Sequence, residues 1–141
     1  MIVYLDTSTV LRVVLHQPRP LAEWDTWERA YASELLGVEA RRTIDRLRLE
    51  GHLGDAGVVA AQQALTRVEG ALGLVRLTRA VLHRASMPMG TVVKTLDALH
   101  LATALLLSER HGLDLTFATH DSRQATAARA LGFECIGVGR G

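Results

Sequence analysis

The stretch MIVYLDTSTVL, residues 1–11, joins an apolar run to an aspartate and three hydroxyl side chains. Residues 2–5 are continuously apolar and rich in strand formers, which predicts a short buried strand. Asp6 ends this run. Asp6 or Thr7 is suited to cap a following helix, because a side-chain oxygen satisfies the free N–H groups of a first helical turn. Alternatively, Asp6 marks the carboxyl end of the first strand of an α/β sheet, where ligands collect.

Beyond this stretch, short apolar runs alternate with segments of helical periodicity. This alternation predicts a three-layer α/β/α domain with a central, mostly parallel sheet of about five strands. We expect strands at 2–5, 31–32, 74–77, 115–119 and 135–139, and helices at 8–16, 21–29, 34–50, 56–72, 78–85, 96–110 and 122–131. Ser33 is the expected cap of the helix at 34–50. The sequence contains no internal repeat or linker, so residues 1–141 are expected to form a single domain.

The composition limits the classes of partner. The 141 residues include 16 Lys and Arg against 15 Asp and Glu, a net charge of +1. Such a balance gives no global attraction to nucleic acid or membranes, so any RNA contact must use a local patch. Cys135 is the only cysteine, which excludes an intrachain disulfide and fits a reducing compartment. We find no signal peptide and no apolar run long enough to span a bilayer, so we expect a cytoplasmic protein without a membrane partner.

Four carboxylates lie at or near the junctions between the expected strands and helices. Asp6 ends the first strand, Asp97 lies in the first turn of a helix, and Asp121 follows the strand at 115–119. Glu39 lies inside a long helix, beside its apolar stripe. Because the carboxyl ends of parallel strands share one edge of a sheet, we expect these acids to converge on one cleft.

Each acid also has a purely structural interpretation. Asp97 in a first turn is favoured by the helix dipole, by about 0.3–1 kcal/mol. Asp121 with Gln124 three residues later resembles a capping box. Glu39 is one turn from Arg42, and such a pair contributes about 0.2–0.5 kcal/mol. Any one of these acids is therefore explained without a site, and only their convergence favours one.

Clustered carboxylates repel one another unless a cation lies between them. Oxygen-only ligands suit Mg²⁺ or Mn²⁺, which prefer octahedral oxygen shells. A hard divalent ion at an open site orients phosphate oxygens and activates a water molecule. The pattern therefore indicates hydrolysis of a phosphodiester or a phosphomonoester.

Four segments resemble the acidic motifs of PIN-domain nucleases: VYLDTSTVL at 3–11, GVEARR at 37–42, TLDALHLATAL at 95–105 and FATHDSRQATAARALGF at 117–133. They resemble most closely the small VapC-type ribonuclease toxins of bacterial toxin–antitoxin pairs, and they occur in the right order over nearly the whole chain. The resemblance implies a PIN-like fold and a Mg²⁺- or Mn²⁺-dependent endoribonuclease. The expected products carry a 3′-hydroxyl and a 5′-phosphate.

The same resemblance implies roles for particular residues. The metal-binding catalytic acids would be Asp6, Glu39, Asp97 and Asp121. Hydroxyl donors to an acid, a phosphate or a metal-bound water would be Thr7, Ser8 and Thr119. The resemblance also implies a homodimer and a cognate antitoxin protein whose tail covers the cleft.

The sequence assigns less specific roles to three basic or titratable side chains near the acids. Arg41 and Arg42 follow Glu39 on the long helix and are candidates for contacts with RNA phosphates, although a solvated face is the alternative. His100 lies one turn beyond Asp97, and we interpret it as a partly buried packing or hydrogen-bonding residue.

Two other functions are open at the level of the sequence. A haloacid-dehalogenase-type phosphatase uses a strand-end D-x-D, whereas the second position here is Ser8, and Lys94 is not at a strand end. A non-catalytic PIN-like binding module would be favoured by the loss of an acid, yet all four acids are present.

Overall fold

The computed structural model describes residues 1–139. Residues 140 and 141, the last two of the expected single domain, lie outside the described residues. The strands are β1 (Ile2–Leu5), β2 (Arg29–Ser33), β3 (Gly73–Val75), β4 (Leu115–Ala118) and β5 (Glu134–Ile136). The helices are α1 (Thr7–Val14), α2 (Leu35–Leu49), α3 (Asp55–Ala71), α4 (Arg79–Ala85), α5 (Thr95–His111) and α6 (Ser122–Ala130).

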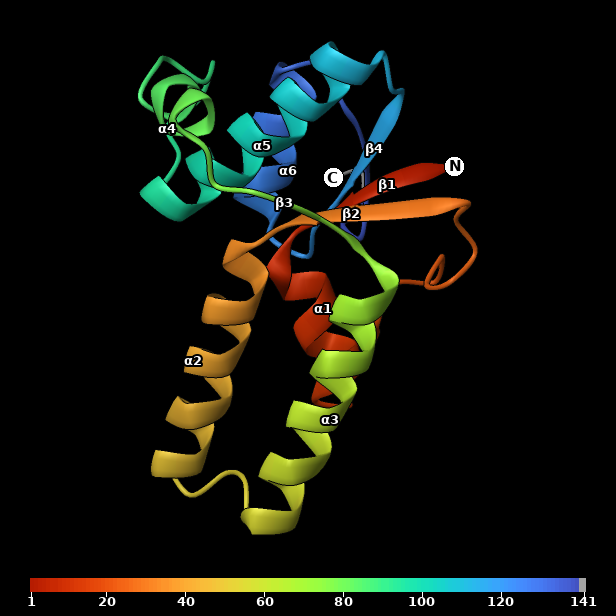
Figure 1. The fold of residues 1–141 in the computed structure, drawn as a ribbon, viewed down its shortest axis with the longest axis vertical. Helices are drawn as coiled ribbons and strands as arrows, with labels where there is room; N and C mark the ends of the chain where they lie inside the picture. The colour runs from red at the N-terminus through yellow and green to blue at the C-terminus, as the bar shows by residue number, and fades with distance from the viewer. Residues whose placement is uncertain (140–141) are drawn as a thin grey trace.

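The sheet has the strand order β3-β2-β1-β4-β5, and each neighbouring pair is parallel. Figure 1 labels the strands β1 to β4. The central strand β1 sets the register, because Tyr4 lies opposite both Tyr31 of β2 and Phe117 of β4. All five carboxyl ends therefore lie at one edge of the sheet, as the sequence predicts. The α/β class and the parallel sheet are confirmed.

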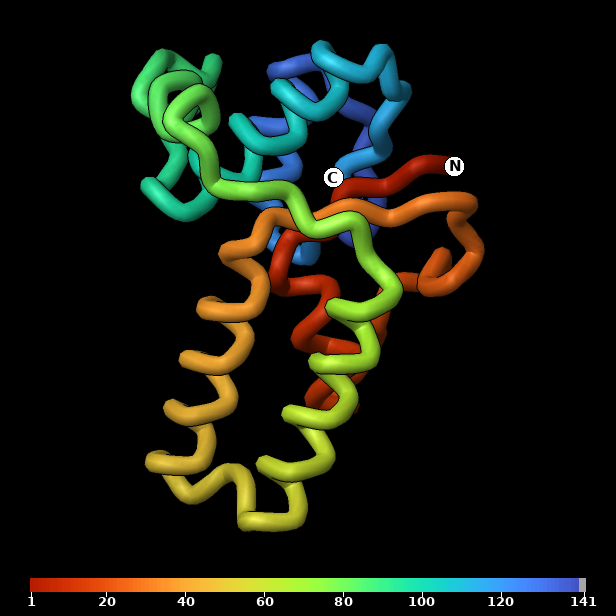
Figure 2. The backbone as a smooth tube through the Cα atoms, in the orientation of Figure 1, coloured from red at the N-terminus to blue at the C-terminus, as the bar shows by residue number. Residues whose placement is uncertain are grey.

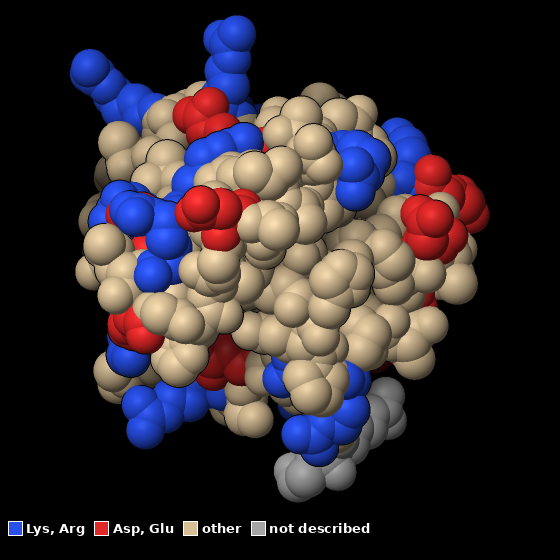
Figure 3. Space-filling view, turned by 90° about the horizontal axis from the view of Figure 1, so that it is seen from below, with Lys and Arg blue, Asp and Glu red and all other residues tan. Residues whose placement is uncertain are grey.

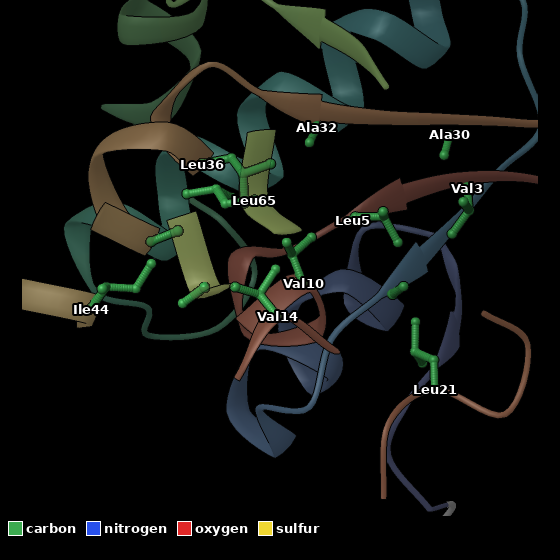
Figure 4. Close-up of a cluster of buried hydrophobic side chains, with 13 residues drawn as sticks. Val3, Leu5, Val10, Val14, Leu21, Ala30, Ala32, Leu36, Ile44 and Leu65 are labelled. Atoms are coloured by element: carbon green, nitrogen blue, oxygen red, sulfur yellow. The ribbon is translucent and has the colours of Figure 1, made fainter. Parts of the chain in front are cut away.

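Alternate residues of β1 face opposite layers, as a strand period of two requires. Val3 and Leu5 join a core formed with α1, α2 and α3, which Figure 4 shows in close-up. Tyr4 faces the other layer, where α4, α5 and α6 pack, and its ring stacks on Phe117 at 5.3 Å between centroids. Both faces of the sheet are covered, so the edge with the carboxyl ends is the place left for a site.

The prediction of a helix at residues 21–29 is wrong. The segment forms turns instead, and Asp25 has φ 66°, a left-handed conformation that interrupts a right-handed helix. The chain must also travel back to the amino edge of the sheet, where the Glu28 N–H donates to the Met1 carbonyl. Trp24 and Trp27 do pack together, edge to face at 5.1 Å, but across a turn and not along a helix.

The helices α2 and α3 form a hairpin that projects from the sheet in Figures 1 and 2. The prediction of Ser33 as the cap of α2 is wrong, because Ser33 ends β2 and Glu34 is the N-cap residue, although Ser33 Oγ still accepts a hydrogen bond from the Leu35 N–H at 3.1 Å. The two helices are joined on the surface by an ion pair between Arg41 and Glu69 at 2.6 Å. Within residues 1–139, no helix is both long and apolar enough to cross a bilayer.

Candidate active site

Asp6 is the first residue after β1 and the cap of α1. Its Oδ2 atom accepts hydrogen bonds from Ser8 Oγ at 2.6 Å and from Thr119 Oγ1 at 3.1 Å. Gln124, in the amide orientation that satisfies both ends of its side chain, donates to Oδ2 at 3.0 Å and to Oδ1 at 3.2 Å. These donors come from α1, the end of β4 and α6, so Asp6 is held in place by three elements. The side chain is buried, and its hydroxyl and amide partners are neutral donors.

Glu39 reaches the same edge from the second turn of α2. Its Oε1 atom accepts hydrogen bonds from Thr7 Oγ1 at 2.9 Å and from His100 Nε2 at 2.6 Å. The alternative pairing of Glu39 with Arg42 is wrong, because Arg42 pairs with Asp45 at 3.2 Å. The long helix thus directs this acid inward, toward α1 and α5, and not along its own surface.

Asp97 lies in the first turn of α5 and is partly buried. Burial raises the pKa of Asp97, and the negative charges of Asp6, Asp121 and, more weakly, Glu39 raise it further. His100 acts in the opposite direction. Asp97 therefore lies within electrostatic range of the other three acids. That the four acids share one site stays a prediction.

Asp121 is the most exposed of the four acids and caps α6. Its Oδ1 atom accepts hydrogen bonds from the N–H groups of Arg123 at 2.9 Å and Gln124 at 3.3 Å. The structural interpretation of Asp121 as a cap is thus confirmed. The second bond of a capping box, between the Gln124 side chain and the Asp121 N–H, does not form. The Gln124 side chain turns toward Thr119 and Asp6, as described above.

The arrangement leaves particular carboxylate oxygens available to a ligand. Among residues 1–139, no hydrogen-bond donor contacts Glu39 Oε2 or Asp121 Oδ2, and the Asp97 carboxylate accepts none at all. Glu39 and Asp121 therefore each have one oxygen fixed by the protein, while the second oxygen is free. Fixing one oxygen orients the other, which is how neighbouring donors tune a metal ligand.

The donor set fits a hard divalent cation in its chemistry and charge. It consists of carboxylate oxygens with hydroxyl groups behind them, and its negative charges are incompletely neutralised, as the raised pKa of Asp97 indicates. Within residues 1–139, no three acidic, histidine or cysteine side chains are already close enough to share an ion. Holding one thus requires the free carboxylates to approach one another.

His100 is the main member of this site whose place the sequence did not reveal. It is buried, its Nδ1 atom lies 2.8 Å from the Tyr4 hydroxyl, and its Nε2 atom donates to Glu39. Burial alone would lower the pKa of His100, but the Glu39 hydrogen bond and the charge of Asp6 outweigh burial, so the pKa is raised. The prediction of a hydrogen-bonding histidine is confirmed, but its partner is an acid of the site. The available signal was its position three residues after Asp97, on one helix face.

The two candidate RNA-binding arginines have protein partners. Arg41 holds Glu69 through two hydrogen bonds, at 3.1 and 2.6 Å, and Arg42 holds Asp45. Their contact with RNA stays a prediction. On the face seen in Figure 3, basic groups lie around the margins with acidic groups between them, and no continuous basic patch forms there.

The chain thus combines a parallel α/β/α sheet with an acid, Asp97, that feels the charge of three others. The PIN domain family model matches residues 3–130, and the chain belongs to this family. It is 30% identical over 135 residues to Ribonuclease VapC46 of Mycobacterium tuberculosis (strain ATCC 25618 / H37Rv), covering 95% of each chain. It is 27% identical over 136 residues to Ribonuclease VapC47 of the same species (strain CDC 1551 / Oshkosh), covering 93% of each.

Solved structures share the fold at lower sequence identity. VapBC2 from Rickettsia felis, bound to a DNA fragment from their promoter, superposes with a TM-score of 0.66 at 13% identity, covering 96% of this chain and 99% of that one. FitAcB from Neisseria gonorrhoeae gives 0.66 at 20% identity and covers 96% of each chain. PAE2754 from Pyrobaculum aerophilum gives 0.56 at 19% identity, covering 95% of this chain and 89% of that one.

Proposed function

We propose that this chain is a divalent-metal-dependent endoribonuclease that acts as the toxin of a toxin–antitoxin pair. The observation that carries the proposal is that Asp97 lies within electrostatic range of Asp6, Glu39 and Asp121, in a PIN domain whose relatives are named ribonucleases. We further infer that residues 1–141 form a single PIN-like nuclease domain, because both core clusters pack on the same sheet. We also propose a cytoplasmic localisation, because the RNA substrate is present in the cytoplasm.

The four acids would hold Mg²⁺, with Mn²⁺ as an alternative of similar chemistry. When bound, such an ion would supply Lewis acidity toward a phosphodiester and a lowered pKa for a water molecule. The protein's own part is orientation. Ser8 and Thr119 fix Asp6, and Thr7 fixes Glu39, through the hydrogen bonds described above. We assign these three hydroxyls to positioning the acids and not to direct contact with RNA.

The direct experiment follows cleavage of an end-labelled RNA by the purified chain. We expect internal cleavage with Mg²⁺ or Mn²⁺, products with 3′-hydroxyl and 5′-phosphate ends, and no cleavage in EDTA. The same ions should raise Tm, because a ligand that binds only the folded state stabilises it. A folded chain that cleaves equally well in EDTA, or that shows neither cleavage nor a change in Tm with either ion, would refute the proposal.

The two alternatives fit the geometry less well. In a haloacid-dehalogenase-type phosphatase the strand-end Asp attacks the phosphorus, but Asp6 Oδ2 accepts hydrogen bonds from Ser8 and Thr119. Its nucleophilicity is reduced by these donors, and the second acid of that motif is missing. A non-catalytic binding module would have no need of four mutually repelling carboxylates.

An antitoxin partner follows from the same charge argument. A protein segment that enters an acidic cleft without a metal ion should present a cation, because an Arg or Lys satisfies the same carboxylates. Val38, which is 62% exposed and precedes Glu39 on α2, offers an apolar contact on the same helix as this acid. The partner should therefore combine one inserted basic residue with apolar neighbours on a helix or extended strand.

Mutating that inserted basic residue of the partner to Ala should restore metal-dependent cleavage in the complex. Much of the binding should remain, because the apolar contacts persist. The measurement is a titration of the purified toxin with wild-type and variant partner, scoring RNA cleavage and complex formation in parallel. Inhibition that is unchanged by the substitution would mean that the partner blocks RNA elsewhere.

We further propose that the chain forms a homodimer, and an apolar surface beside α4 suits the interface. An apolar groove of about 560 Å³ lies between α4, the loop that follows it and the start of α5, and its lining includes Leu82, Met87 and Val92. Val92 is 98% exposed, and an exposed apolar patch of this kind commonly marks a protein interface. We propose that a second copy of the chain covers this groove. Val92→Asp should then convert a dimer to a monomer in sedimentation experiments.

A further inference from the structure

A pocket of about 410 Å³ lies beside the acid cluster, and the candidate site does not use it. It is lined by the last turn of α1, the loop after α1, and the chain segments that follow β4 and β5. His120, one of its lining residues, directly precedes Asp121. The His120 N–H donates to Ser8 Oγ at 3.1 Å, and Ser8 in turn donates to Asp6. The pocket and the acids are thus neighbours along one edge of the sheet.

Two arginines make the pocket basic. Arg12 and Arg19 both line it, and the Arg12 guanidinium donates to the Arg19 carbonyl at 2.9 Å. Neither side chain forms an ion pair with any acid in residues 1–139, so both charges are available. Glu23 is the only carboxylate of the lining among those residues. Guanidinium groups bind phosphate oxygens through paired, charge-assisted hydrogen bonds, so the pocket suits a phosphate.

His120 adds a neutral acceptor to the same pocket. Its Nδ1 atom lies 2.9 Å from the Gly137 carbonyl, which only accepts, so Nδ1 carries the ring proton. Nε2 is then an acceptor, and this buried atom has no hydrogen-bond partner among the described residues. Gly137 has φ 101°, and a Cβ there would overlap the Thr119 carbonyl, so the loop that orients the ring depends on this glycine.

We propose that this pocket, which we name the ribose-phosphate pocket, holds a nucleotide of the RNA strand next to the bond that is cleaved. Arg12 and Arg19 bind its phosphate, and His120 Nε2 accepts a hydrogen bond from its 2′-hydroxyl. A phosphodiester offers no donor to Nε2, whereas a ribose does and a deoxyribose does not. The inference rests on the proposed function and adds to it the group by which the site selects RNA over DNA.

The phosphate part is tested by binding of a fluorescent single-stranded RNA in EDTA, where no cleavage is expected. Removing one phosphate-binding cation should reduce the slope of log affinity against log salt concentration by about 0.7. Arg12→Gln should show this reduction, and Arg19→Gln should show a similar one. The matched control is Arg110→Gln, at the end of α5 remote from Asp97, which should leave the slope unchanged. Equal slopes for wild type, Arg12→Gln and Arg19→Gln would overturn the phosphate assignment.

The ribose part is tested first with the wild-type chain, so that folding of a variant does not matter. An RNA with 2′-deoxy substitutions introduced one at a time should bind about fivefold more weakly at one position, the size typical of one neutral hydrogen bond. His120→Ala should bind that oligonucleotide and the unmodified RNA equally. Uniform binding of all the oligonucleotides by wild type, or a preference that survives in a folded His120→Ala, would overturn the ribose assignment.

These binding results are separable from the proposed function. If the pocket distinguishes ribose from deoxyribose but no ion supports cleavage, the proposed function is wrong and the assignment of the pocket is retained. If the chain cleaves RNA but shows no position-specific effect of 2′-deoxy substitution, the pocket fails and the proposed function stands.

Discussion

Replacing Asp97 by Asn should abolish metal-dependent RNA cleavage and at the same time stabilise the metal-free chain. The carboxylate of Asp97 accepts no hydrogen bond within residues 1–139, and its charge is opposed by burial and by three other acids. Removing that charge relieves the repulsion but removes a ligand. We expect cleavage to fall by at least about 100-fold, the upper end of what the loss of a mere supporting residue causes. Tm without metal should rise by a few degrees.

The stabilising effect should depend on pH in a defined direction. Because the pKa of Asp97 is raised in the folded state, the folded chain binds this proton more tightly than the unfolded chain. The wild type therefore loses stability as pH rises from the usual Asp pKa of 3.8 through the raised value. The advantage of Asp97→Asn should be complete above the raised pKa and absent below pH 3.8.

Asp55→Asn is the matched control, because Asp55 also lies in a first helical turn but is exposed and outside the cluster. Loss of its favourable interaction with the helix dipole should cost about 0.3–1 kcal/mol, so Tm should fall slightly and cleavage should be unchanged. Thermal melts in EDTA across pH, combined with cleavage rates, measure both variants. An Asp97→Asn variant that cleaves at the wild-type rate would remove Asp97 from the mechanism.

His100→Leu should have the second-largest effect, on stability and activity together. The substitution replaces the imidazole by an apolar side chain of similar size. The buried Tyr4 hydroxyl thereby loses its Nδ1 partner. The Tyr4 hydroxyl retains interactions with Ser33 and Thr103, so the loss of this one hydrogen bond should cost about 0.5–1.5 kcal/mol. Glu39 also loses the 2.6 Å donor that orients it, so cleavage should fall by about 10- to 100-fold.

The double variant Tyr4→Phe/His100→Leu separates the two effects. Removing both partners of a buried hydrogen bond is nearly neutral, so the double variant should recover most of the free energy of unfolding. Its activity should stay low, because Glu39 still lacks its donor. Urea unfolding and cleavage rates provide the comparison. Activity that recovers together with stability would show that His100 acts only through packing.

Much of the fold could be predicted from local sequence patterns. Three such patterns are the continuous apolar run at 2–5, the helix with Leu36, Ala40 and Ile44 on one face, and the helix that starts near Asp97. The structure places each of these elements within a residue or two of its predicted bounds. Residues 21–29 were not predictable in this way. Their two tryptophans have helical spacing, but the chain there must return to the amino edge of the sheet, a tertiary constraint that a local pattern does not contain.

The candidate site divides along the same line. Asp6, Asp97 and Asp121 could be singled out because parallel strands bring their carboxyl ends together whatever the side chains are. Glu39 lies inside a helix and was singled out by the resemblance of its motif. Among the partners of these acids, Thr119 follows from the family resemblance. The contacts of His100 with Glu39 and of Gln124 with Asp6 could not be predicted, because they join elements far apart in the chain. Arg42 was a reasonable partner for Glu39 by spacing, but the direction in which α2 packs turns Glu39 away from it.

The central claim is that the four acids form one cation site, and anomalous X-ray scattering from crystals grown with Mn²⁺ tests it most directly. The account predicts a manganese peak at the carboxyl edge of the sheet, with Asp97 among its ligands together with oxygens of Asp6, Asp121 or Glu39. Crystals of Asp97→Asn grown in the same way should show a weaker peak or none. A manganese ion bound elsewhere on the wild-type chain, with the four acids left without one, would contradict the account.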